Sequence, residues 1–117
     1  MKRDMEFART MLLWMEDRED RIFYLNDGFP GLEAGGEKIL GHLALLISAG
    51  FVDQPSMHAY RMTWDGHEFL DKVRDDEIWS QTKNGASRLG SWSVKILSDL
   101  ASGFIRAKAV ELGLPLG

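Results

Sequence analysis

The sequence predicts a mainly α-helical fold with a small antiparallel β-hairpin. Three features support this prediction. Apolar residues recur at helical spacing in several separate segments. Two short runs rich in β-forming residues, 51–54 and 60–63, flank the turn-forming segment 55–59. A glycine, Gly50, stands directly between a helical pattern and the first of these runs, where a helix commonly ends. The chain has 117 residues, which is the size of one domain.

The first expected element is a helix over residues 5–18 with Asp4 as its N-cap. The charged run 16–21 ends this helix, and the aromatic and branched run 22–25 favours a short strand. The apolar residues of the helix recur at intervals that place them on one buried face. They are Phe7, Met11, Leu12, Trp14 and Met15.

Residues 26–36 are rich in glycine and proline and are expected to form a loop with at most one helical turn. A second helix is expected over residues 37–49, and Gly50 follows it as a residue in the left-handed conformation. The helical spacing is defined by five apolar residues. They are Ile39, Leu40, Leu43, Leu46 and Ile47.

Residues 51–54 and 60–63 are candidate antiparallel strands. The connection 55–59 is slightly long for a tight hairpin, and Pro55 indicates a turn or the end of a strand. Thr63 is then expected to cap a long helix over residues 64–83.

Residues 84–91 are expected to form a second loop. A last helix begins after Ser91 or Ser93 and extends to about Leu112. We therefore divide the sequence into a domain over residues 1–80 and a helical extension over 81–117 packed on it. One face of the last helix is apolar. It contains Val94, Leu97, Leu100, Ala101, Phe104 and Ile105.

This order of elements is that of a winged helix-turn-helix domain with added C-terminal helices. The helix over residues 37–49 then takes the place of the recognition helix, and the hairpin is the wing. A helix preceding the recognition helix is hard to fit into residues 26–36, so the helix-turn-helix is degenerate.

Four phrases of the sequence resemble a family of small, largely uncharacterised bacterial and phage or prophage proteins with a winged-helix-like core. The phrases are MKRDMEFARTMLLWMED, HLALLISAGFVD, TWDGHEFLDKVRDDEIWSQTK and SWSVKILSDLA. The resemblance covers most of the chain except residues 26–36. It implies a winged helix with extra C-terminal helices, and it supplies no catalytic residues.

The composition argues against several classes of protein. The chain has no cysteine, hence no disulfide, thiolate metal site or cysteine nucleophile. The N-terminus lacks the pattern of a signal peptide, and no run approaches the roughly 18 apolar residues of a membrane span. We therefore expect a cytoplasmic protein that does not contact a membrane.

No motif predicts catalysis. His67 and Asp71 are spaced i, i+4 but lack a third metal ligand at useful spacing, and the acidic run 74–77 is typical of a solvated helix turn. We predict neither a cofactor, nor a metal, nor an enzymatic activity.

The charge distribution bears on the partner. The net charge is −4; residues 1–60 carry six Lys/Arg and ten Asp/Glu (−4), and residues 80–117 carry five and two (+3). An acidic N-terminal half argues against an unspecific grip on phosphates. The candidate nucleic-acid contacts are therefore few: Lys38 and His42 on the recognition helix, and His58 and Arg61 on the wing. For His42, a place in the core is the favoured alternative.

The four tryptophans, Trp14, Trp64, Trp79 and Trp92, are expected mainly in the core. If Trp92 and Phe104 are exposed, they mark an interface with a partner or a second copy.

The function that follows is a non-catalytic regulatory binding module of phage or prophage type, with double-stranded DNA as its first candidate ligand. The alternative is a protein-interaction module, such as a phage-encoded inhibitor of a host defence protein, that uses the winged helix as a scaffold. A homodimer is compatible with both.

Overall fold

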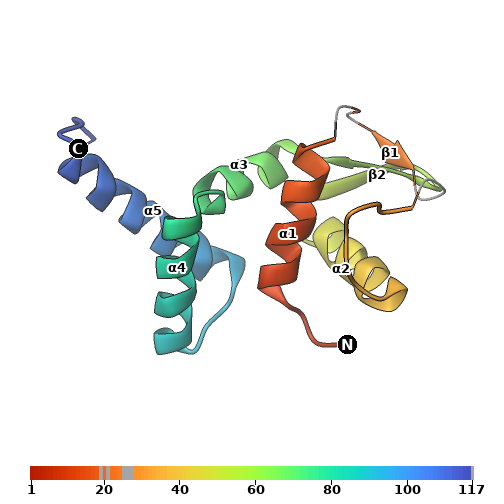
Figure 1. Ribbon diagram of the computed structural model, residues 1–117, viewed down its shortest axis with the longest axis horizontal. Helices are drawn as coiled ribbons and strands as arrows, with labels where there is room; N and C mark the ends of the chain where they lie inside the picture. Colours follow the sequence, from red (N-terminus) through yellow and green to blue (C-terminus); the bar gives the residue numbers. More distant parts are fainter. Residues whose placement is uncertain (19, 21, 25–27, 117) are drawn as a thin grey trace. The chain divides into compact units, whose positions relative to one another are not determined.

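The computed structural model describes residues 1–18, 20, 22–24 and 28–116. This part of the chain is mainly helical, with a small antiparallel sheet, as predicted (Figure 1). Its elements are α1 (Met5–Glu16), β1 (Phe23–Tyr24), α2 (Gly36–Ser48), β2 (Val52–Ser56), β3 (Ala59–Met62), α3 (Trp64–Val73), α4 (Asp76–Leu89) and α5 (Val94–Glu111). The predicted strand end at Leu25 and the loop residues 26 and 27 lie outside the described residues, as do residues 19 and 21 of the charged run.

The chain divides into two compact units, Met1–Leu70 and Asp71–Gly117. The first contains α1, α2, the sheet and most of α3, and the second contains α4 and α5. The domain boundary expected between residues 80 and 81 falls inside α4.

The sheet of the first unit has the order β1-β3-β2, with both pairs antiparallel. Phe23 lies opposite Tyr60, and Val52 lies opposite Met62. The hairpin turn consists of residues 57 and 58 alone, which corrects the expected five-residue connection. Strand β2 extends through Pro55 because an irregularity in register between Asp53 and Ser56 leaves the proline unpaired in the ladder.

The core of the first unit lies between α1, α2 and the sheet. Its aromatic rings pack in pairs: Phe51 stacks on Phe69 with 5.0 Å between centroids, and Phe23 stacks on Tyr60 at 5.7 Å. The buried apolar residues confirm most of the predicted inner faces of α1 and α2, but Leu40, which was expected on the inner face of α2, is exposed, and Trp14 and Ile47 are half-buried. The buried residues include Phe7, Met11, Leu12, Met15, Ile39, Leu43 and Leu46.

Three local predictions about helix ends are confirmed. The Asp4 carboxylate accepts a hydrogen bond from the Phe7 N–H at 3.1 Å and caps α1. Gly50 follows α2 with φ of 81°, a left-handed conformation that costs glycine little. The Thr63 hydroxyl accepts from the Gly66 N–H at the start of α3. The two capping hydrogen bonds join residues three positions apart, and the Gly50 conformation concerns a single residue.

The helix expected over residues 64–83 is in fact two helices. Helix α3 ends at Val73, and the Asp75 carboxylate accepts a hydrogen bond from the Ile78 N–H at 3.0 Å, which starts α4. An aspartate side chain competes with the helical backbone for amide protons, so it favours a helix start over a helix interior.

The loop expected over residues 84–91 is wrong, because α4 continues to Leu89 and ends at Gly90, whose φ is 69°. Gly85 is tolerated inside the helix because it packs on α5: a Cβ added there would lie 3.1 Å from a Leu100 methyl. Helix α5 then begins after Ser93, one of the two predicted start points, whose hydroxyl accepts from the Ile96 N–H at 3.2 Å.

Candidate functional site

Helix α2, the element expected to meet a ligand, has an exposed face that is largely apolar. Leu40, with 48% of its surface exposed, and Leu45 border this face, and Ala44 and Gly41 lie between them. The thioether of Met1 lies against Gly41, where a Cβ would collide with it. We call Met1, Leu40, Gly41, Ala44 and Leu45 the α2 patch.

Lys38, the cation of α2, is held by the start of α1. Its Nζ lies 3.2 Å from the Asp4 carboxylate and 4.8 Å from the centre of the Phe7 ring. The hydrogen bond from the Phe7 N–H, and secondarily Lys38 itself, lower the pKa of Asp4 below its usual range. The charge of Lys38 is therefore already matched within the first unit.

His42 is buried, with 1% of its surface exposed. Its Nε2 accepts a hydrogen bond from the Asp4 N–H at 2.9 Å, so its Nδ1 carries the proton and donates to the Lys38 carbonyl at 2.9 Å. The Phe7 ring packs edge-on against the imidazole at 5.1 Å. The Nε2 bond joins α2 to the start of α1, the Nδ1 bond stays within α2, and neither nitrogen lies on the exposed face of α2.

The hairpin carries the other two predicted contacts. The Arg61 guanidinium donates from Nε and Nη2 to one oxygen of Asp53, at 3.2 and 3.1 Å, across the β2–β3 pair. His58 is exposed in the turn beside Met57, which is also exposed. The hairpin therefore presents one histidine and one methionine at its tip, and a guanidinium whose charge is matched.

The four predicted nucleic-acid residues thus have different surroundings: Lys38 and Arg61 form ion pairs, His42 is buried, and His58 is exposed. The α2 patch was missed in the sequence because Leu40 was assigned to the buried face. The spacing of Ile39, Leu43 and Leu46 could have corrected this: at 100° per residue these three share one direction, and Leu40 lies about 100° away from it.

Among the described residues, no group of three or more His, Cys, Asp or Glu is arranged to hold a metal ion. His67 lies 4.0 Å from Glu16, and Asp71 pairs with Arg74, so each of these two residues contacts an oppositely charged neighbour other than the residue at i, i+4.

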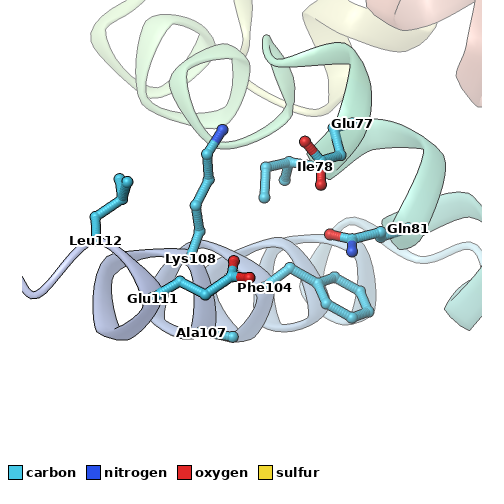
Figure 2. Close-up of a pocket in the computed structure, with 8 residues that line it drawn as sticks. All are labelled: Glu77, Ile78, Gln81, Phe104, Ala107, Lys108, Glu111 and Leu112. Carbon is cyan, nitrogen blue, oxygen red and sulfur yellow. The ribbon is translucent and has the colours of Figure 1, made fainter.

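The second unit has a groove of about 380 Å³ between α4 and α5 (Figure 2). Phe104, half-buried, lies in its wall with its ring toward Gln81, and the Lys108 side chain extends toward Asp75, with Nζ 3.9 Å from the Asp75 carboxylate. Apolar and charged side chains alternate along the wall. The lining residues are Glu77, Ile78, Gln81, Phe104, Ala107, Lys108, Glu111 and Leu112.

The tryptophans are not all in the core, which corrects one expectation. Trp79 is buried, and Trp14 is half-buried and donates to the Pro30 carbonyl at 2.7 Å. Trp92 is exposed, and Trp64, with 79% of its surface exposed, lies at the first turn of α3. Aromatic side chains of this exposure are more typical of contact surfaces than of cores.

Comparison with known proteins gives a family. The profile of a family described as "Hypothetical protein (DUF2513)" matches residues 2–92. The chain belongs to the DUF2513 family. A similar protein of Haemophilus influenzae, described as "Uncharacterized protein", is 38% identical over 92 residues, which cover 71% of this chain and 76% of the relative.

No solved structure matches this chain. The DUF2513 profile ends at Trp92, just before α5 begins at Val94. Within the described residues, none of the helices is both long enough and apolar enough to cross a membrane.

Proposed function

We propose that this DUF2513 protein is a non-catalytic binding module that docks onto another protein through the α2 patch. The observation that carries the proposal is the exposed face of α2, where Leu40, Ala44 and Leu45 lie together between Glu37 and Ser48, in place of a row of hydrogen-bond donors. A helix that presents an apolar stripe to solvent is suited to fit an apolar groove on a partner.

A winged-helix scaffold is part of this proposal. Two features support it: the sheet order β1-β3-β2, and the position of α2 directly before the β2–β3 hairpin. Residues 28–35 contain turns and bends but no helix, so the described part of the segment before α2 does not supply the usual first helix of a helix-turn-helix. A winged-helix scaffold that lacks this first helix still exposes one face of α2 to solvent, and docking onto a protein requires no more than that face.

The partner surface is expected to be apolar at its centre and basic at its edge. Glu37 is exposed in the first turn of α2, and Glu33 is exposed in the loop before it. Residues 1–70 carry seven Lys/Arg and twelve Asp/Glu, a net charge of −5. Complementary charge speeds association and selects the partner. The resemblance to phage and prophage proteins supports a regulatory role in which the chain blocks or recruits a host protein.

The test is affinity capture with the 117-residue chain from cells that express it, analysed by quantitative mass spectrometry. Wild type should retain one protein in stoichiometric amount, and Leu40→Ser combined with Leu45→Ser should lose it. Tyr24→Ser is the matched control, because Tyr24 is a similarly exposed apolar residue on β1. Circular dichroism checks that each variant is folded. Equal capture by the double variant and the wild type would overturn the proposal.

Duplex DNA is the second candidate, favoured by the winged-helix order of elements. In that case His58 would meet phosphates, and so would Lys38 and Arg61 once their ion pairs with Asp4 and Asp53 open. A salt-dependent shift of duplex DNA, weakened by Lys38→Ala with Arg61→Ala and unchanged by the two leucine substitutions, would favour DNA over protein.

A further inference from the structure

We infer that α5 pairs with α5 of a second copy in an antiparallel dimer. The contact is a stripe of five residues: Ile96, Leu100, Gly103, Ala107 and Val110. Their spacing of four, three, four and three residues repeats every seven, which is the repeat that keeps one helix seam against another over several turns. We call these five residues the α5 stripe.

Most of the α5 stripe lies away from the side of α5 that is buried in the second unit. Leu100, half-buried, stands at its border against Gly85 of α4, and Ala107 borders the groove between α4 and α5. The fully buried residues of α5 are Leu97, Ala101 and Ala109. In the stripe, Gly103, Ala107 and Val110 are exposed, and Val110 has 70% of its surface exposed. Helix α5 therefore has apolar residues on a second side as well. A helix on the surface of a monomer normally has only one apolar side, which faces the core.

Gly103 stands at the centre of the stripe. A glycine inside a helix destabilises it by about 1 kcal/mol relative to alanine. Within the described part of the chain no neighbour requires this glycine, because a Cβ added there would meet no atom within 4 Å. A helix from a second copy that crosses at Gly103 and packs on Ala107 would explain the glycine. Without a side chain at this position, the two helix backbones can approach each other closely.

The stripe is self-complementary, which is what a two-fold interface requires. Two apolar members lie on each side of Gly103. Asp99 lies four residues before it and Arg106 three residues after it, both on the same flank of the helix. Antiparallel pairing about Gly103 brings Asp99 of one copy near Arg106 of the other, twice. Lys95, 3.1 Å from Asp99, extends this into a network of three charges.

The dimer goes beyond the proposed function and is independent of it. The α5 stripe lies after residue 92, outside the part of the chain that the DUF2513 profile matches, whereas the α2 patch lies inside it. Failure of one proposal leaves the other standing.

The mass in solution tests the inference. The chain has a mass of 13.2 kDa, and light scattering or sedimentation at about 100 µM, a concentration suited to a small interface, should give twice this value. Gly103→Glu should give 13.2 kDa while circular dichroism stays unchanged. Ser87→Glu, which adds the same charge to an exposed position of α4, should remain a dimer.

Gly103→Ala separates the dimer from a purely local role of the glycine. It should raise the helicity of the monomer and yet weaken the dimer at least tenfold. Asp99→Arg should also weaken the dimer, and adding Arg106→Asp in the same chain should restore it. A monomeric wild type would overturn the inference, and so would a dimer that survives Gly103→Glu. Protection of the α5 stripe from hydroxyl radicals in a monomer would overturn it as well, because residues of the same chain would then cover the stripe.

The absence of native cysteine makes the orientation testable by disulfide cross-linking. A mixture of Ile96→Cys and Val110→Cys chains should cross-link, and either variant alone should not. Cross-linking of each variant with itself would overturn the antiparallel arrangement.

Discussion

Gly66 shows, at the scale of a single residue, why one substitution should break the start of α3. A Cβ added at Gly66 would collide with the carbonyl oxygen of Phe51 and lie 2.8 Å from Cγ of Met62. The carbonyl cannot move away easily, because it accepts the Thr63 N–H at 2.9 Å. We predict that Gly66→Ala lowers the free energy of unfolding by about 2 kcal/mol.

Urea denaturation followed by circular dichroism measures this effect. Gly36→Ala is the control, since Gly36 begins α2 and a Cβ added there meets nothing within 4 Å. A Gly66→Ala variant as stable as the control would show that the α3 start can shift to admit the methyl group.

Asp4 predicts a pH dependence. Its pKa in the folded state is lowered, first by the Phe7 N–H and then by Lys38, so its contribution to stability is complete above its unfolded pKa, near 3.9. That contribution is lost as the pH falls through the lower folded pKa. Asp4→Asn should therefore be less stable than wild type at pH 7, and the difference should shrink below pH 4.

Thermal unfolding of both proteins from pH 7 down to pH 2.5 measures this difference. In a Lys38→Met background, Asp4→Asn should change the stability less, because the ion pair at 3.2 Å is already absent. A difference that is the same at every pH would assign the role of Asp4 to shape alone.

At the scale of the element, Asp75 decides where one helix stops and the next begins. Its Oδ2 accepts the Ile78 N–H, and its Oδ1 lies 3.9 Å from Lys108. Asp75→Ala should lower the free energy of unfolding by about 1 kcal/mol through loss of the cap. Asp75→Asn keeps a capping oxygen and should stay close to wild type in the same denaturation experiment. Equal losses in both variants would assign the effect to charge.

The elements that the sequence predicted well are those whose ends depend on neighbours along the chain. Asp4, Gly50, Thr63 and Ser93 act within three residues of a helix end or at a single backbone angle, so the residue type is enough to place them.

The elements predicted poorly depend on residues that are distant in the sequence. Residues 84–89 remain helical although Asn84 and Gly85 disfavour a helix, because the missing side chain of Gly85 admits Leu100 of α5. The site shows the same limit. The types of Lys38 and Arg61 were correctly noted as cationic, but their partners Asp4 and Asp53 lie on other elements and became visible only in the fold.

At the scale of the whole molecule, the two units differ in charge. Residues 1–70 have a net charge of −5, and residues 71–117, with seven Lys/Arg and six Asp/Glu, have +1. The unit that contains α2 and the hairpin is thus the acidic one. A duplex of DNA would meet this unit against electrostatic repulsion, whereas a basic protein surface would be attracted.

This asymmetry predicts how the intact chain behaves toward nucleic acid. DNA-binding proteins bind unrelated duplexes with dissociation constants of roughly 10⁻⁴–10⁻⁶ M at physiological salt, mainly through cations on phosphates. For this chain we expect no rise in fluorescence anisotropy of a labelled random duplex up to about 100 µM protein at that salt. A saturable rise that grows as salt is lowered, and that falls with Lys38→Ala and Arg61→Ala, would mean that both ion pairs open for phosphates. The α2 patch would then not identify the partner, because Lys38 and Arg61, which are paired with Asp4 and Asp53 in the free protein, would dominate the binding of DNA.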